Sequence, residues 1–404
     1  MKIKDIRVSI IKNSRNEDTV EIELLSDTGL LASASVPQGA STGEREAISL
    51  PAESAIEKIN GIIIPEIKEK SFESQDEFDD FLCELDGTNN KSRLGANATL
   101  VLSLAFARLL AKSNNQELYE YIAELTHSKP SLPAFYANMI EGGKHAKNNL
   151  DWQEYLIVVK DSSAENQLKI AKDVFDNIGN KVKTLSNSVS FSDEGAYDLN
   201  FENNTAPLEL INLSIKELDL ESKVMLALDV AADSFYDKIN NAYSINGQLV
   251  TIDNLTNIYN DVINKYPVVS IEDPYEENDF EHYATLNTIL NGKNAFVIGD
   301  DLTTTNATSI EKAVSMNSIS GVIIKPNQIG TLTETLEAIK IAKKNNLKII
   351  VSHRSGETED SFIADLAYGI GAYGLKTGAP SPKERMAKYN RIVEIDKIKD
   401  NLQK

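Results

Sequence analysis

"GVIIKPNQIGTLTETLEAIKIAKKNNLKIIVSHRS", residues 321–355, contains two short apolar runs separated by one long run of mixed polarity. The runs at 321–324 and 348–352 have the length and composition of buried strands. The segment between them, "TLTETLEAIKIAKKNN", repeats its apolar residues at helical spacing. A continuous apolar strand followed by a helix and a second such strand is typical of a parallel sheet whose two faces are both covered.

The same pattern extends in both directions from this stretch. Further apolar runs of strand length are "YLIVV", "VMLALD", "VVSIED", "AFVIGD" and "YGLKTG". From residue 268 onward these runs recur every ~25 residues and alternate with helical segments, so that seven or eight strand and helix units are expected. We therefore predict an α/β protein built on a (β/α)8 barrel of the TIM type.

The first third of the chain has a different order of elements. The strand-like runs "IRVSII", "TVEIELLS" and "LLASASV" come first, and four helical segments follow, from "AESAIEKINGII" to "QELYEYIAEL". Strands first and helices afterwards indicate a small α+β domain. "THSKPSLPAF" then places two prolines before a new strand. We expect an N-terminal capping domain at 1–127 and a catalytic barrel at 128–404.

Composition excludes several classes of protein. The 404 residues include 61 acidic and 41 basic side chains, a net charge of −20, which argues against nucleic acid as a partner. The single cysteine, Cys83, excludes an intrachain disulfide and a cysteine-based zinc site. The sequence shows neither a signal peptide at its start nor an apolar run long enough to insert into a membrane. A cytoplasmic location is the expectation.

Charged residues stand where the predicted strands end. In "AFVIGDD" an apolar run of the kind found in buried strands ends in two adjacent carboxylates, Asp300 and Asp301, although an apolar core disfavours charge. Five other strands of the barrel also end in polar or ionisable groups. Together the strand ends supply Asp229, Glu272, Asp300, Lys325, His353, Arg354, Ser355 and Lys376. Because functional residues of such barrels gather at the C-terminal ends of the strands, we predict one shared site.

The residue types of this set predict its chemistry. Three carboxylates with no histidine or cysteine ligand beside them are hard oxygen donors, which suit Mg²⁺ better than zinc. Lys325 and Lys376, in a crowded site, are candidates for a lowered pKa and for the role of general base. A metal with a lysine at the ends of parallel strands favours removal of a proton next to a carboxylate. The cation would also draw an anionic substrate into this acidic protein.

Long motifs resemble the enolase family. "VSHRSGETEDSFIADL" and "IIKPNQIGTLTETLEA" each match enolase signatures over ten or more residues. "SIEDPYEENDF", "GDDLTTTN", "KTGAPSPKERMAKYNRI", "VPQGASTGEREA" and "LDGTNNKSRLGANATL" do so as well. The resemblance covers nearly the whole chain. It implies the reversible dehydration of 2-phosphoglycerate to phosphoenolpyruvate, with two magnesium ions in each active site.

The resemblance also implies a metal site and a mobile lid. Asp229, Glu272 and Asp300 would hold the magnesium that binds the substrate carboxylate. Ser41 would ligate a second magnesium and contact substrate from a lid loop near 37–44, in which Gly39 and Gly43 permit movement.

The remaining roles follow from the same resemblance. Lys325 would be the base that takes the C2 proton, and Lys376 would neutralise the substrate carboxylate. Glu194, in "SDEGAYD", matches the general acid that expels the C3 hydroxyl, with Glu154 of "WQEYLIV" beside it. Four further residues would line the substrate or bind its phosphate: His145, His353, Arg354 and Ser355.

Several local differences from the family leave alternatives open. "GGKHA" places Lys144 beside His145, and "DEGAYD" places Ala196 near Glu194, so the substrate could be a related phosphonate or phospho-hydroxy acid. The altered segment "KNSRNEDT" and the short connection after "STGEREA" lie in the domain that helps form the family's dimer. We expect a homodimer or a higher homo-oligomer. A scaffold or surface-binding role, weakly suggested by the terminal Lys404, is the alternative from another class.

Overall fold

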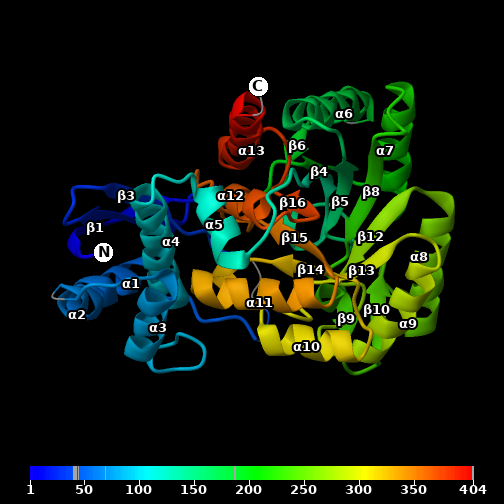
Figure 1. The fold of residues 1–404 in the computed structure, drawn as a ribbon. Helices are drawn as coiled ribbons and strands as arrows, with labels where there is room; N and C mark the ends of the chain where they lie inside the picture. The colour runs from blue at the N-terminus through cyan, green and yellow to red at the C-terminus, as the bar shows by residue number, and fades with distance from the viewer. Residues whose placement is uncertain (40–42, 44, 69, 186–187, 403–404) are drawn as a thin grey trace.

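The structure is a computed structural model that describes residues 1–39, 43, 45–68, 70–185 and 188–402. Ser41 and Lys404 lie outside the described residues, as does half of the segment expected to form the lid. Figure 1 shows a small N-terminal domain at the left of the view and a larger barrel at the right, with the C-terminal helix α13 above them.

The N-terminal domain is a three-stranded antiparallel sheet packed against helices. Its strands are β1 (Ile3–Lys12), β2 (Asp18–Ser26) and β3 (Leu31–Ser35), in the order β1-β2-β3. The helices are α1 (Ala52–Lys58), α2 (Ile64–Ile67), α3 (Gln75–Asp86), α4 (Ala96–Ser113) and α5 (Leu118–Thr126). A π-helical turn, Ile59–Ile63, joins α1 to α2. The predicted α+β order is confirmed.

The barrel is closed by eight of the described strands. In chain order they are β4 (Ala134–Glu141), β5 (Glu154–Val159), β8 (Val224–Asp229), β12 (Val268–Glu272), β13 (Phe296–Gly299), β14 (Gly321–Ile324), β15 (Lys348–Ser352) and β16 (Gly374–Lys376). Pairing of β16 with β4 closes the ring, so the predicted barrel is confirmed.

Helices cover the outside of the barrel. They are α6 (Ala164–Leu185), α7 (Ala206–Glu217), α8 (Ile252–Lys265), α9 (Phe280–Asn291), α10 (Ala307–Ser315), α11 (Leu332–Lys344), α12 (Phe362–Gly369) and α13 (Lys383–Leu402). Two small hairpin-like additions contain β6 (Ser190–Phe191) with β7 (Tyr197–Asp198), and β9 (Tyr236–Asp237) with β10 (Ala242–Ile245) and β11 (Gln248–Val250). In the described chain no helix is both long and apolar enough to cross a bilayer.

One strand of the barrel corrects the prediction of an all-parallel sheet. β5 runs antiparallel to both of its neighbours, β4 and β8, whereas the other neighbouring pairs of the ring are parallel. The segment between β4 and β5 contains no long helix, so the chain returns without a crossover. The N-terminal end of β5 therefore lies at the same edge as the C-terminal ends of the parallel strands.

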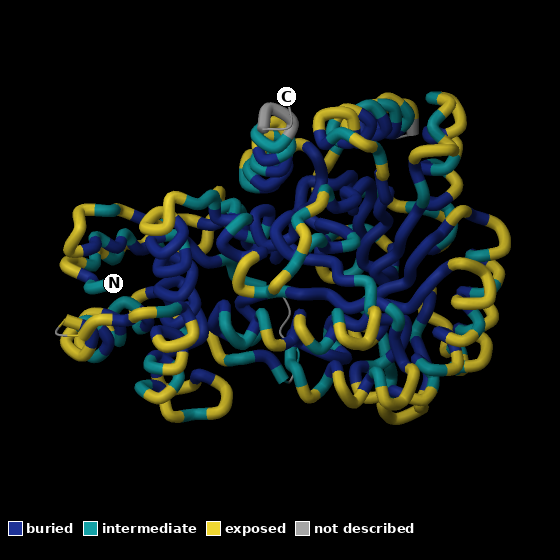
Figure 2. The backbone as a smooth tube through the Cα atoms, viewed as in Figure 1, coloured by how far each residue is buried: buried dark blue, intermediate teal, exposed yellow. Residues whose placement is uncertain are grey.

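The core has two layers, one inside the barrel and one between the barrel and its helices. Ten buried side chains fill the inside, among them Tyr136, Ala227, Phe296 and Ile350. A second, larger cluster joins the outer face of the strands to the helices and to the N-terminal domain. Figure 2 shows this burial as dark blue strands inside helices whose outer faces are exposed. Because the barrel is filled with side chains, its chemistry is confined to the strand ends.

The segment between α5 and β4 joins the two domains. It runs from the end of α5 at Thr126 to the start of β4 at Ala134. The boundary that we expect at residue 127 falls in this segment and stays a prediction.

Candidate active site

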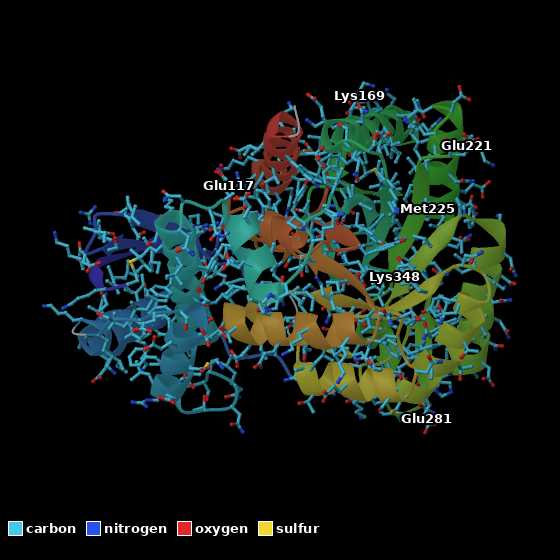
Figure 3. All side chains as sticks on the ribbon, viewed as in Figure 1. Glu117, Lys169, Glu221, Met225, Glu281 and Lys348 are labelled. Carbon is cyan, nitrogen blue, oxygen red and sulfur yellow. The ribbon has the colours of Figure 1, made fainter. Side chains whose placement is uncertain are left out.

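The alternation of side chains along β8 places a carboxylate inside the barrel. Met225 and Ala227 belong to the inner core, whereas Leu226 and Leu228 belong to the outer one. Successive side chains of a strand point to opposite faces, so Asp229 at the end of β8 faces inward as Ala227 does. Met225, labelled in Figure 3, lies at the other end of the same strand.

Irregular pairing turns two further acids into the same space. The register of β12 against β8 shifts between Val268 and Ser270, and Glu272 then pairs beside Asp229. The register of β4 against β5 shifts between Asn138 and Ile140. Such bulges re-aim the residues that follow them. As a result, Glu272 and Glu141 are both buried. The sequence predicted a site residue on β12, which carries Glu272, but none on β4, which carries Glu141.

Lys376 lies at the centre of a group of carboxylates. Its Nζ is 2.8 Å from an oxygen of Glu154, and 2.9 Å from oxygens of both Asp229 and Glu272. Burial by itself would lower the pKa of Lys376, but the three carboxylates outweigh it and hold this pKa well above its usual value. Lys376 is therefore a fixed positive charge, and the prediction that its pKa would be lowered is wrong for this structure.

The antiparallel direction of β5 explains why Glu154 belongs to the site although it begins its strand. Glu154 pairs with Glu141 on one side and with Asp229 on the other. Burial raises the pKa of Glu154 to about 8, against the opposing effect of Lys376. Burial, with the charges of Glu194 and Glu154, also raises the pKa of Glu141 well above its usual value. With a pKa of about 8, Glu154 keeps its proton near neutral pH.

Lys325 directly contacts Asp300. Its Nζ donates a hydrogen bond to Asp300 Oδ2, from the residue that follows β14 to the one that follows β13. Burial favours a lower pKa for Lys325, but Asp300 outweighs burial and raises it. The predicted lowering of the pKa of Lys325 is therefore wrong for the protein in this state, because the lysine has a carboxylate as its counterion.

The adjacent pair Asp300 and Asp301 is held by a third aspartate. Asp273 accepts hydrogen bonds from the backbone N–H groups of Asp300, at 2.9 Å, and Asp301, at 2.7 Å. The hydroxyl of Tyr283 also donates to Asp273, at 2.9 Å. These bonds fix the turn after β13 and leave both side chains of the pair directed at the cavity.

Glu194 is held by donors that meet on one of its two oxygens. Asn138 Nδ2 donates to Glu194 Oε2 at 2.8 Å, and His353 Nε2 lies 3.1 Å from the same oxygen. The other oxygen, Oε1, faces His145 Nδ1 at 3.9 Å. Burial would raise the pKa of Glu194, but the neighbouring imidazoles and Arg385 hold it well below its usual value. Burial lowers the pKa of His145.

Arg354 is buried against a carboxylate from the N-terminal domain. Its Nη1 donates to Glu46 Oε2 at 3.0 Å and its Nη2 to Glu46 Oε1 at 3.2 Å. Nη1 also donates to Asn327 Oδ1 at 3.0 Å. Ser355 is buried beside it. A guanidinium paired in this two-pronged way is oriented for oxyanions such as carboxylate and phosphate.

One cavity collects the predicted residues. Its lining includes His145, Glu154, Glu194, Asp229, Asp300, Lys325, His353, Arg354, Ser355 and Lys376. Glu272 lies behind Lys376 rather than on the lining. Ser41 falls outside the described residues.

Six residues around this cavity were not predicted from the sequence. They are Glu46, Asn138, Glu141, Gln153, Asp273 and Arg385. Two of them had a usable signal, because Asp273 directly follows Glu272 and Gln153 directly precedes Glu154. Gln153 Nε2 reaches Asp229 Oδ2 at 3.4 Å.

The donor set fits a magnesium ion. Asp229, Glu272 and Asp300 offer only oxygen atoms, the ligands that Mg²⁺ prefers. Each of the three has a lysine ammonium as its counterion here, so a positive charge already stands where a cation would. Among the described residues, two groups have ligand atoms close enough to share a metal: Asp273, Asp300 and Asp301, and His145, Glu154 and Glu194. The predicted trio is not one of these groups; Lys376 contacts Asp229 and Glu272, and Lys325 contacts Asp300.

Comparison with known proteins places both domains. The family model described as "Enolase, N-terminal domain" matches residues 3–122, and that described as "Enolase, C-terminal TIM barrel domain" matches residues 129–403. The enolase of Campylobacter lari is 39% identical over 98% of this chain and 97% of its own. The enolases of Methanopyrus kandleri and Methanocaldococcus jannaschii are 39% and 38% identical, each over 98% of this chain and 95% of their own. With both domains matched and nearly its full length aligned, the chain belongs to the enolase family of hydro-lyases.

Proposed function

We propose that this hydro-lyase converts 2-phosphoglycerate reversibly to phosphoenolpyruvate, as the glycolytic enzyme does. The observation that carries the proposal is the presence in one cavity of a lysine and a glutamate on separate elements, with Lys376 and Arg354 beside them. Elimination of water needs a base for the C2 proton, an acid for the C3 hydroxyl, and cations for the two anionic ends of the substrate. The cavity supplies a residue for each of these tasks.

Lys325 takes the C2 proton in this proposal. The C2–H bond breaks, its electron pair is delocalised into the carboxylate, and the proton goes to Lys325 Nζ. Lys325 must be neutral to act, whereas its contact with Asp300 raises its pKa in the free protein. Lys325 becomes a base when Asp300 no longer pairs with it. The nearby positive charge of Lys376 then favours the neutral form of Lys325.

Glu194 gives a proton to the leaving hydroxyl. The C3–O bond breaks, the C2=C3 double bond forms and water is released. Because Asn138 and His353 both meet Glu194 at Oε2, Oε1 is the atom that carries the acidic proton. The low pKa of Glu194 makes it a carboxylate in the free protein, which suits the reverse reaction, where it would deprotonate water. Negative charge of the bound substrate raises this pKa for the forward reaction, with Glu154 beside it as a second carboxyl.

The two anionic ends of the substrate bind to different groups. Arg354 and Ser355 bind the phosphate, Lys376 neutralises the carboxylate, and His145 and His353 line the space between. Ser41, in the lid expected near 37–44, closes over the substrate. Arg354 already holds a carboxylate, that of Glu46, in two hydrogen bonds, which supports an oxyanion as its ligand.

Asp229, Glu272 and Asp300 would hold one Mg²⁺, and Ser41 would contribute to a second. A bound Mg²⁺ polarises the substrate carboxylate and stabilises the charge that develops on it, which lowers the barrier to proton removal. The oxygen-only donor set supports this assignment.

A direct assay tests the proposal. The conjugated double bond of phosphoenolpyruvate absorbs ultraviolet light, so its appearance from 2-phosphoglycerate can be followed with and without Mg²⁺. We expect turnover that disappears on chelation and returns with added Mg²⁺. Absence of turnover in the Mg²⁺-loaded protein would refute the proposal.

A related substrate is the second candidate. Lys144 is exposed and lines the cavity, so it adds a positive charge that could contact a longer or differently charged phospho-acid. Ala196, the other departure from the family pattern, is fully buried and outside the lining. Lys144→Ser should leave turnover of 2-phosphoglycerate nearly unchanged if that is the substrate.

We propose a cytoplasmic homo-oligomer. A cleft of about 810 Å³ between the N-terminal sheet, α5 and α13 is lined by both lysines and glutamates, including Lys12, Glu21, Lys383 and Glu394. Mixed charges of this kind can pair with themselves across a two-fold axis. Glu117, labelled in Figure 3, lies at this place and accepts a hydrogen bond from Arg391 of α13. Light scattering of the purified protein tests the oligomeric state.

A further inference from the structure

Arg385 is a fully buried arginine in the first turns of α13 that sequence analysis did not assign to the site. Its Nη1 donates to the carbonyl oxygen of Arg354 at 2.6 Å, and its Nη2 to that of Ser355 at 2.7 Å. Nη2 also reaches the carbonyl oxygen of Asp193, at 3.3 Å, and Ser14 Oγ, at 3.5 Å. Arg385 thus joins the turn after β15 to the loop that carries Glu194.

The surroundings of Arg385 are closely fitted to it. Gly378 has a φ of +78°, and a Cβ there would lie 2.8 Å from Arg385 Cδ and 3.1 Å from the carbonyl oxygen of Glu194. Only glycine adopts this conformation without strain and also leaves the space. The close approach fixes the guanidinium between the loop of Glu194 and the strand end of His353.

The contact between Arg385 and His353 determines where the imidazole proton lies. Arg385 Nη1 is 2.8 Å from His353 Nδ1. A guanidinium carries donors only, so the nitrogen that faces it must accept. Nδ1 is therefore unprotonated, the imidazole is neutral, and its proton is on Nε2. Nε2 lies 3.1 Å from Glu194 Oε2, so the imidazole donates to Glu194.

The charged groups around His353 have opposing effects on its pKa. Burial and the positive charge of Arg385 oppose protonation, whereas Glu194 and Glu357 favour it, and the pKa of His353 is lowered to about 4. Glu357 is itself paired with Lys388, at 2.7 Å, which offsets part of its charge. The neutral imidazole that the hydrogen-bond geometry requires agrees with this balance.

We infer that Arg385 is a positioning residue that holds His353 as the neutral Nε2–H tautomer. His353 is then a permanent hydrogen-bond donor to Glu194 Oε2 and does not relay protons to it. The acidic proton of Glu194 is thereby confined to Oε1, the oxygen on the side of His145. Arg385 acts through His353 and does not touch the substrate.

The first test uses the unaltered protein and its four histidines. Nitrogen-15 spectra of the imidazole rings distinguish protonated from unprotonated ring nitrogens, and comparison with His353→Gln identifies the signals of His353. We expect a protonated Nε2 and an unprotonated Nδ1 that do not change between about pH 5.5 and 8.5, a range in which an ordinary histidine titrates. A protonated Nδ1, or protonation of both nitrogens near neutral pH, would overturn the inference.

The second test removes the guanidinium. In Arg385→Met the pKa of His353 should rise above about 4, because the positive charge is lost while burial still opposes protonation, and kcat/KM at pH 6 should then fall below its plateau. The unaltered protein should show no such loss at pH 6 in a parallel titration at saturating Mg²⁺. Arg385→Lys keeps a charge and a donor, and should restore the unprotonated Nδ1 at least in part.

Arg391→Met is the matched control, because Arg391 lies on the same helix and is ion-paired with Asp365 and Glu117 but does not contact His353. It should leave the ring spectrum of His353 unchanged. An unchanged ring spectrum in a folded Arg385→Met protein would contradict the inference, and if that variant fails to fold, the spectrum of the unaltered protein decides. The spectra need no turnover, so they separate this inference from the proposed reaction, on which only the kcat/KM measurement rests.

Discussion

At the scale of single residues, the site is a set of buried charges that balance one another. Lys376 is 2% exposed and is surrounded by Glu154, Asp229 and Glu272. A buried charge without a partner is strongly unfavourable, so each member of this group depends on the others. The removal of one member should therefore affect both stability and chemistry.

Two substitutions separate the halves of the proposed reaction. Lys325→Ala should abolish turnover and also the exchange of the substrate C2 proton with deuterated solvent, because it removes the base. Glu194→Gln should block turnover yet permit exchange, since the carbanion can form and be reprotonated by Lys325. Proton NMR of 2-phosphoglycerate in deuterium oxide measures both. Retained exchange in Lys325→Ala would mean that another group is the base.

Glu154 should make the stability of the metal-free protein depend on pH. Its pKa is about 8 in the folded protein and near 4.5 in the unfolded chain, so the folded state binds its proton more tightly. The stability that this proton contributes is complete below about pH 4.5 and is lost as the pH rises through about 8. Urea titrations in chelator between these limits should show a decline that Glu154→Gln makes smaller.

The exposed Glu165, on α6, supplies the control for that experiment. Glu165→Gln should leave the decline in place. An equal decline in Glu154→Gln and in the unaltered protein would show that other groups produce the pH dependence.

Which site residues can be predicted depends on where their partners lie. Asp229, Glu272, Asp300 and Lys325 directly end apolar runs, so strand geometry alone brings them to one edge. Glu46 reaches Arg354 across 308 residues of sequence, and no local pattern encodes that contact. The pKa of Lys325 was mispredicted for a related reason, because its partner Asp300 comes from a different strand.

At the scale of elements, a strand's existence was predictable but its direction was not. "YLIVV" is apolar whichever way it runs, because both faces of β5 are covered. The residues between β4 and β5 lack the short turn that marks a hairpin in sequence. Glu154 was assigned to the site through the family resemblance, and only the reversed direction of β5 gives the structural reason.

The three carboxylates at the ends of β8, β12 and β13 predict that the activity depends on a metal ion. Asp300→Asn removes one charge from the proposed ligands and should weaken Mg²⁺ binding about ten-fold or more. Calorimetric titration of the chelated and dialysed protein measures the affinity. Asp253→Asn, at an exposed position of α8, should bind Mg²⁺ as the unaltered protein does. Full turnover in excess chelator would contradict the assignment of Asp229, Glu272 and Asp300.

The lid expected near 37–44 should differ in hydrogen exchange between the free and the bound protein. Its amide hydrogens should exchange quickly in the free protein and slowly with substrate and Mg²⁺ bound, because closure would exclude water. Hydrogen exchange with mass spectrometry measures this, and peptides from the buried helix α4 serve as the internal reference. Equal exchange in both states would count against a lid role for Ser41.

At the scale of the whole molecule, the net charge of −20 opposes compaction. Raising the ionic strength from about 0.01 M to 0.15 M shortens the screening length from about 30 Å to 8 Å, so the thermal midpoint should rise. Differential scanning calorimetry in chelator measures it. Choline chloride should act as sodium chloride does, whereas an effect limited to sodium would indicate a bound cation instead.

The barrel itself was predictable because its signal is repeated along the chain. Each strand and helix unit is weak evidence alone, but units such as 321–355 recur in one order. The homo-oligomer that we propose has no comparable signal, since the mixed charges of the cleft proposed as its interface come from segments distant in sequence.

The reversed strand β5 has a consequence for the order of folding. β4 and β5 are joined by a short segment, whereas closure of the barrel requires β16 to meet β4 from the far end of the domain. The entropic cost of loop closure grows slowly with length, and for these two loops it differs by roughly 2–3 kcal/mol. Local pairs form early because they fix less chain. The hairpin should therefore bring Glu141 and Glu154 together before the other strands arrive, and the ring would be completed around a pair of carboxyl groups already in place.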